Sequence, residues 1–325
     1  MRRMNDERGA TAIFTAIVIV MLMGFAALAV DVGALWWDKK ELQNGADAAA
    51  LALAQSCAEA DGATGCENDR PMATDLAEDN KTATLGVNEA RIPIDGIRRV
   101  DAHGNPDPHG NYVSVTVTGQ GRIWFSAFLG AGPSDVSARA TASWGPVGSA
   151  RVLPLAISLC ELLTYGVPSG AGEIVVLISD DATGCHPDGA VHEAPGGWGW
   201  LVPESTPDCT VVVDAGAWAD SKTGKPIPTG CDGALQGLQG KTVLMPVFDR
   251  TNGLTGSNAK FHLIGFAQLE VEAYCFGNHI KYTRPGDLGC PSKRWIAGRF
   301  VQMVDLSADT GDGENFGATT VRLTG

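Results

Sequence analysis

Hydrophobic and polar positions divide the chain into an uncharged N-terminal run and a long, more polar remainder. Residues 9–30 carry no charged side chain and are mostly apolar; Arg2, Arg3 and Arg8 precede them and Asp31 follows them. At about 1.5 Å per residue, a helix of this length spans roughly 33 Å, enough to cross the hydrocarbon core of a bilayer. The pattern predicts a transmembrane anchor over residues 9–30.

The arginines before the anchor predict its orientation. By the positive-inside rule they place residues 1–8 in the cytoplasm as a short tail and the bulk of the chain outside, although Lys39 and Lys40 also follow closely. A cleaved signal peptide is the alternative. The apolar run is longer than a usual signal core, no clear cleavage site precedes a polar start, and a helical pattern continues past residue 30. These features favour a retained anchor in the cell membrane.

A helical stripe continues beyond the anchor over residues 31–56. Apolar side chains recur there at spacings of three and four, which predicts one long helix from about 12 to 56. Trp36 and Trp37 fall just past the anchor, where an interfacial aromatic belt is expected. A narrow patch suited to close helix packing follows, with either a partner helix or the chain's own domain as its occupant; its residues are Leu42, Ala46, Ala49, Ala50 and Leu53.

The pattern then changes to strands. Two segments, 113–118 and 136–144, alternate apolar and polar residues with a period of two. With the helix, they predict a pilin-like α+β region over residues 31–145, and a short helix is expected over 71–85. Residues 145–149, Gly-Pro-Val-Gly-Ser, read as a linker. Short apolar runs separated by turn residues then predict a mostly β extracytoplasmic domain over 150–325. The predicted fold class is α+β with a single N-terminal transmembrane helix.

All eight cysteines follow the anchor, which fits an oxidising compartment. Cys57 and Cys66 bracket one turn-rich loop, and Cys275 and Cys290 bracket another, so we expect a disulfide in each pair. The other four are expected to pair among themselves, with the connectivity left open; they are Cys160, Cys185, Cys209 and Cys231. The predicted β domain is therefore stapled by disulfides.

Composition and motifs argue against several functions. The net charge of −13 and the absence of a basic stripe make a nucleic-acid partner unexpected. No Gly-x-Ser-x-Gly elbow and no recognised zinc or calcium spacing occurs, so we expect no enzyme activity, no catalytic residue, no cofactor, no metal and no small-molecule substrate. The acidic run from Asp305 to Glu314 and the loop from Asp101 to His109 read as solvated loops. The Trp-rich segment 195–200 is either an exposed binding loop or part of a β core.

Two blocks of the N-terminal region carry a resemblance to a known family. They are the span ending Ala26-Ala27-Leu28-Ala29-Val30-Asp31-Val32-Gly33 and the run Leu42-Gln43-Asn44-Gly45-Ala46-Asp47-Ala48-Ala49-Ala50. At this separation, about residues 8–53 resemble the N-terminal module of TadG-like proteins of the tight-adherence (Tad, or Flp) pilus-assembly system. Gly45 stands where the family usually has alanine. Related pilins carry a glutamate five residues after a cleavage glycine; after Gly9 that position is Phe14.

The resemblance implies a membrane-anchored component of pilus assembly, structural or minor pilin-like, with other pilus-assembly proteins as partners. It would act by helix packing and not by catalysis. An envelope-anchored adhesin or binding module that uses the β domain is the alternative, and the Trp-rich segment is the feature that favours it.

Overall fold

The computed structural model describes residues 8–59, 66, 69–79, 97–106, 111–121, 123–125, 127, 130, 132, 134–167, 174–178, 197–204, 208–222, 227–253, 258–304, 308–311 and 313–324. The chain divides into two compact units. The first comprises Met1–Ser56, Gly62–Ser143 and Leu323–Gly325, and the second comprises Cys57–Asp61 and Trp144–Arg322. The α+β fold class predicted from the sequence is confirmed.

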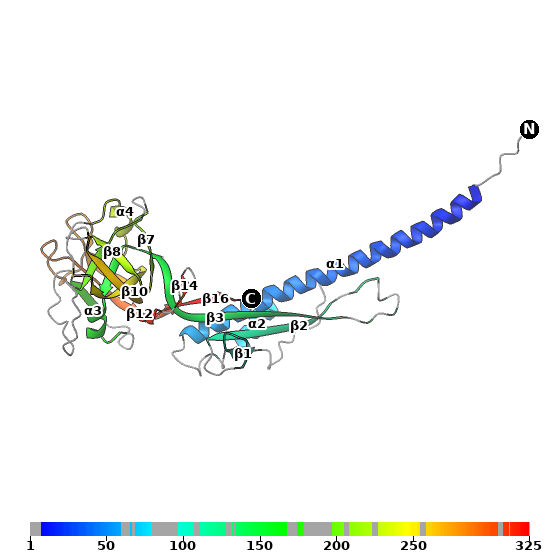
Figure 1. The fold of residues 1–325 in the computed structure, drawn as a ribbon, viewed down its shortest axis with the longest axis horizontal. Helices are drawn as coiled ribbons and strands as arrows, with labels where there is room; N and C mark the ends of the chain where they lie inside the picture. The colour runs from blue at the N-terminus through cyan, green and yellow to red at the C-terminus, as the bar shows by residue number, and fades with distance from the viewer. Residues whose placement is uncertain are drawn as a thin grey trace, which may run out of the picture. The chain divides into compact units, whose positions relative to one another are not determined.

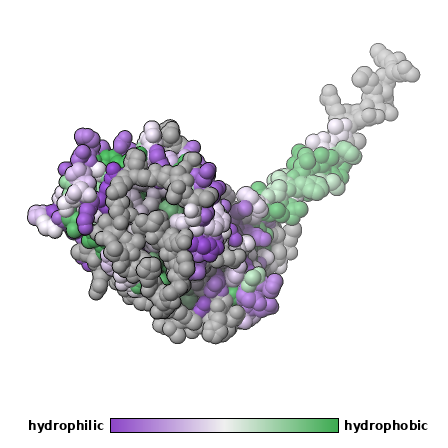
Figure 2. Space-filling view, turned by 60° about the vertical axis from the view of Figure 1, so that its left-hand side comes forward, coloured by the Kyte–Doolittle hydropathy of each residue, from purple (hydrophilic) through white to green (hydrophobic). Residues whose placement is uncertain are grey.

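A single helix, α1 (Arg8–Glu59), dominates the first unit (Figure 1). Its 52 residues correspond to about 78 Å of helix. From Thr11 to Val30 nearly every side chain is exposed, whereas the second half buries one face. Figure 2 shows the exposed half as a continuous band of apolar residues. Among the described residues, α1 is the one helix long and apolar enough to cross a membrane, by length and composition.

The second half of α1 packs in a small helix-and-sheet unit. The short helix α2 (Arg70–Asp79) and three antiparallel strands complete it: β1 (Ile97–Val100), β2 (Tyr112–Gly121) and the first part of β3 (Ser134–Val152). The period-two pattern holds, because Val115 lies opposite Ala140 and both are fully buried. Close packing on α1 is visible at Gly121, where a side chain would overlap Leu35.

Strand β3 corrects the predicted linker at residues 145–149. These residues lie inside β3, which continues to Val152 without a break. Ser134–Ser143 pair with β2, and further along Ser149–Val152 pair with β7 (Val211–Asp214). Gly148 is required for close approach and not for flexibility, because a Cβ there would overlap the backbone of Gly311. A Gly/Pro cluster reads as a linker by composition, but here it marks where two backbones meet.

The second unit is mostly β, and part of its sheet closes on itself. β10 (Lys260–Cys275) pairs with both β8 (Trp218–Lys222) and β9 (Thr242–Thr251). β8 pairs with β6 (Trp198–Leu201), β6 with β4 (Leu155–Ser158), and β4 with β9, which completes a five-stranded ring. Closure pairs both edges of each ring strand and encloses apolar side chains. The larger apolar core of this unit includes Ile157, Trp198, Trp200, Met245, Val247, Ala267 and Leu269.

The remaining elements extend this ring. β12 (Trp295–Val301) pairs with the second half of β10 and with β5 (Ile174–Ile178). The short helix α3 (Leu159–Thr164) begins after Ser158, whose hydroxyl accepts the N–H of Cys160 at 3.3 Å. The other short elements are α4 (Asp232–Leu235), β11 (Lys281–Tyr282), β13 (Met303–Val304), β14 (Asp309–Thr310), β15 (Glu314–Asn315) and β16 (Ala318–Leu323).

Candidate functional site

The predicted packing patch on α1 is covered by the chain itself. Its five side chains, Leu42, Ala46, Ala49, Ala50 and Leu53, are each no more than 4% exposed. Next to them, the Gln43 side-chain amide donates to the carbonyl of Arg139 in β3 at 3.1 Å. Of the two occupants that the sequence left open, the structure favours the chain's own helix-and-sheet unit.

Helix α2 explains the small departure from the family pattern at Gly45. A Cβ on Gly45 would lie 3.0 Å from the backbone carbonyl oxygen of Ala77. This separation is shorter than ordinary van der Waals contact, and the obstacle is a backbone atom. Ala73 and Ala77 are buried on the same helix. Gly45 therefore lets α2 approach α1 closely, at the usual helix-propensity cost of about 1 kcal/mol relative to alanine.

Asp31 forms a contact that the sequence gave no signal for. It is the first charged residue after the apolar run, yet only 4% of it is exposed. Its carboxylate accepts the backbone N–H of Trp124 at 2.8 Å and that of Phe125 at 3.1 Å. Both donors lie in the connection between β2 and β3, some 93 residues away in sequence. A buried carboxylate is costly unless it is hydrogen-bonded, and these amides meet that requirement.

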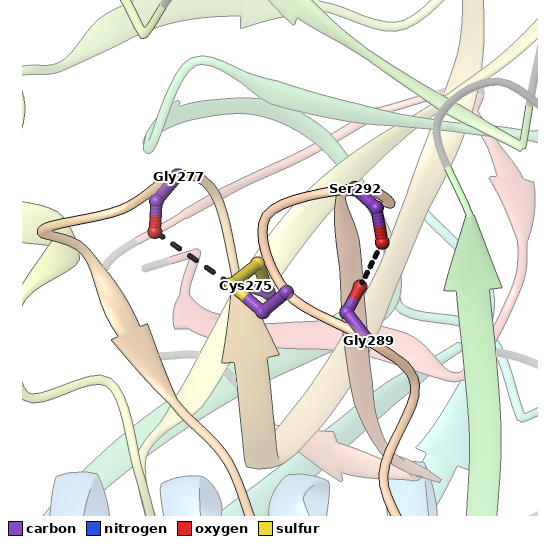
Figure 3. The surroundings of a disulfide bond; sticks show 5 residues. Cys275, Gly277, Gly289 and Ser292 are labelled. Carbon is purple, nitrogen blue, oxygen red and sulfur yellow. Dashed lines mark hydrogen bonds between the residues drawn. A yellow bond between two sulfur atoms is a disulfide. The ribbon is translucent and has the colours of Figure 1, made fainter.

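The described cysteines are all disulfide-bonded. Cys275 is bonded to Cys290 with the Cα atoms 6.0 Å apart, the pair expected from the loop it brackets (Figure 3). Cys209 is bonded to Cys231, which lies within the set of four whose connectivity was left open. Cys57, Cys66 and Cys160 are disulfide-bonded as well. Cys185 lies outside the described residues.

The Cys275–Cys290 bond joins the end of β10 to a turn (Figure 3). The Ser292 hydroxyl donates to the Gly289 carbonyl at 3.1 Å, which fixes the turn beside the bond. Cys275 is fully buried next to Trp295 and Ala297 in a small apolar cluster. The bond therefore closes a loop of 15 residues against the core.

Replacing both Cys275 and Cys290 with alanine is expected to lower the free energy of unfolding of the second unit by about 3 kcal/mol. The reason is that a 15-residue cross-link restricts the unfolded chain by about that amount. Urea unfolding followed by tryptophan fluorescence measures the change. The wild type under reducing conditions is the control. A variant with an unchanged urea midpoint would contradict the prediction.

The Trp-rich segment 195–200 was expected to be either an exposed binding loop or part of a β core. Over the residues that the structure describes, it is part of the core. Trp198 and Trp200 are 4% and 3% exposed and pack edge to face with ring centroids 5.2 Å apart. Phe276 contacts both rings. Residues 195 and 196 lie outside the described residues. The feature that favoured an adhesin therefore fills a core instead of offering an exposed aromatic surface.

Two titratable groups in the described part of the chain, Asp101 and Glu272, form structural contacts. Asp101 accepts the backbone N–H of Asn105 at 2.9 Å and that of His103 at 2.8 Å, and the Asn105 amide leads the effects that lower the pKa of Asp101. Glu272 accepts from Arg299 at 2.7 Å and also binds Arg284; the Arg299 hydrogen bond is the main cause of its lowered pKa. These contacts fix a turn and neighbouring strands.

The described residues contain no group of three or more His, Cys, Asp or Glu side chains able to hold a metal. From the acidic run, Asp309 pairs with β3 in β14, and Glu314 lies in β15. Asp305 and Asp312 of that run, and Asp107 and His109 of the other loop, lie outside the described residues.

The structure combines a helical span long and apolar enough to cross a membrane with a compact helix-and-sheet unit that contains the second half of the same helix. The comparison with known families agrees. Residues 9–56 match the family described as Flp pilus-assembly TadE/G-like, and residues 38–142 match the family described as Tad-like Flp pilus-assembly. These matches confirm the resemblance of the N-terminal module to TadG-like proteins of the Tad/Flp pilus-assembly system. No curated protein and no solved structure matches the chain.

Proposed function

We propose that the protein is a structural component of Tad/Flp pilus assembly, held in the cell membrane by residues 9–30 with the rest of the chain outside the cytoplasm. The observation that carries the proposal is the difference in burial between the two halves of α1. Its first half exposes large apolar side chains such as Phe14, Leu22 and Phe25, at 72%, 61% and 71%. Its second half is the central helix of a folded unit. A bilayer supplies the burial that the first half lacks.

The continuity of α1 supports a retained anchor over a cleaved signal. The helix passes through residue 30 without a break, and the residues after it bury the face that holds the sheet. The disulfides support an extracytoplasmic position, since they persist in oxidising compartments. The family supports pilus assembly as the process. The protein then acts through packing and positioning, without a chemical step.

Orientation is tested by protease treatment of intact spheroplasts. We expect digestion of both units, because the arginines before the anchor favour a cytoplasmic N-terminus. A tag fused to the N-terminus should stay protected, which controls for lysis. Full protection of the C-terminal unit would overturn the proposed topology.

The function is tested by deleting the gene, counting surface pili and complementing with two versions of the chain. The full chain should restore piliation. Residues 31–325, exported behind a cleavable signal, should not, although they keep the helix segment that forms the core of the first unit. A chain beginning at residue 60 is a poorer test, because it lacks Leu42, Ala49 and Leu53 and so loses that core. Restoration by residues 31–325 would contradict an anchored structural role.

A further inference from the structure

The connection between β2 and β3 carries two adjacent large aromatic side chains that are more than half exposed. Trp124 is 60% exposed and Phe125 is 51% exposed. Exposed single apolar residues are ordinary, but two adjacent aromatics at one strand connection form a patch that suggests a binding surface. Ile123, the residue before them, is half-buried.

Asp31 fixes the position of these aromatics along α1. Its carboxylate holds the backbone amides of Trp124 and Phe125 at 2.8–3.2 Å. Asp31 is also the residue at which the uncharged run ends. If residues 9–30 cross the bilayer, the aromatic pair lies at the depth where the hydrocarbon core gives way to headgroups. The pair and the anchor belong to the same compact unit.

We infer that the β2–β3 connection is a second membrane contact, in which Trp124 and Phe125 enter the outer interface of the same bilayer that α1 crosses. The inference rests on the anchor proposed above. Tryptophan and other amphipathic aromatic rings favour this interface. Lipid is the expected partner of Trp124 and Phe125, because the two side chains lie at the end of the proposed span. None of the residues that the structure describes covers them.

The contact also accounts for the buried charge at Asp31. An aspartate at the edge of a span loses much of its hydration, and unpaired burial of a carboxylate is expensive. The amides of Trp124 and Phe125 replace that hydration while their side chains enter the lipid. The connection and the anchor then form a two-point attachment, which fixes the tilt of the first unit relative to the membrane plane.

The depth of Trp124 in the bilayer can be compared with that of Trp36 and Trp37 on α1. They are 60% and 54% exposed on α1, five and six residues beyond Asp31. At about 1.5 Å per residue they lie roughly 8 Å further from the bilayer centre. Within the interface, Trp124 is therefore expected to lie closer to the hydrocarbon core than Trp36 and Trp37.

The test uses the full chain reconstituted into phosphatidylcholine vesicles, with and without lipids brominated on their acyl chains. Subtracting the fluorescence of Trp124→Phe from that of the wild type isolates the Trp124 emission. We expect brominated lipid to remove most of this emission and aqueous acrylamide to quench it weakly. Trp218→Phe is the matched control, since Trp218 is 44% exposed in the second unit and its emission should respond to acrylamide alone.

Asp31→Ala provides an independent arm. Without the carboxylate, the connection loses its attachment, and we expect the Trp124 emission to become accessible to acrylamide while the chain stays resistant to alkaline carbonate. If Trp124 in the otherwise wild-type chain responds to acrylamide and not to brominated lipid, while the chain remains embedded, the second contact is wrong and the anchor stands. Release of the whole wild-type chain by carbonate would overturn both.

Discussion

Leu22→Arg is expected to release the protein from the membrane and to leave a deletion strain without pili. Leu22 lies near the middle of the uncharged run and is 61% exposed on α1. An arginine at the centre of a bilayer-spanning helix costs at least about 2.5–3.5 kcal/mol. That cost corresponds to a shift in membrane partitioning of roughly 60- to 300-fold. Alkaline carbonate extraction followed by immunoblotting measures the released fraction.

Two control variants separate loss of the anchor from other effects of a new charge. Leu22→Ala keeps the span apolar and should remain in the membrane fraction. Asn44→Arg places the same charge on an exposed position of α1 beyond the span and should also remain there. Retention of Leu22→Arg in the membrane, with normal piliation, would show that residues 9–30 do not form the anchor.

Ala49→Trp is expected to prevent α1 from docking in the first unit and thereby to abolish piliation. Ala49 is fully buried, and so are Ala46, Ala50 and Leu53 around it. Adding even a few methylene groups to a filled core costs about 1–3 kcal/mol, and an indole ring adds far more volume than that. The second unit has its own core and is expected to stay folded. Limited proteolysis should cleave the first unit and spare the second.

The matched control is Asn44→Trp, which places the same side chain on an exposed position of the same helix. It should leave the proteolysis pattern of the first unit unchanged. If Ala49→Trp abolished piliation while the first unit stayed protease-resistant, the patch would act on a partner after all. Normal piliation by Ala49→Trp would contradict both roles of this face, which are packing inside the first unit and contact with a partner.

The sequence by itself determined the elements whose signal is local. An uncharged run of 22 residues needs no tertiary context to predict a span, because length and apolarity suffice. The long helix, the alternation that produced β2 and β3, and the family resemblance were likewise visible in short segments. The expected helix of residues 12–56 corresponds to α1, Arg8–Glu59. The Cys275–Cys290 bond also joins residues that are close in sequence.

Tertiary structure decided which of several local interpretations holds. The alanine patch fits either a partner helix or an internal sheet, and only the position of the sheet selects the second. The segment 145–149 has the composition of a linker, yet it lies inside β3, where Val147 and Ser149 pair with β14. Trp198 and Trp200 are core residues because they pack on each other and on Phe276, and the Trp198 indole N–H donates to the Leu177 carbonyl in β5.

The contact between Asp31 and the amides of Trp124 and Phe125 has no sequence signature at all. Every residue except proline has a backbone N–H, so the sequence does not mark which amides will donate. The amides of Trp124 and Phe125 are also 93 and 94 residues away from Asp31. Periodicity and composition report on the surroundings of a residue only within a few turns of helix or strand. A charge that ends an apolar run is ordinarily expected in water. Only the folded chain shows that Asp31 is buried and hydrogen-bonded, because burial depends on which distant segment arrives beside it.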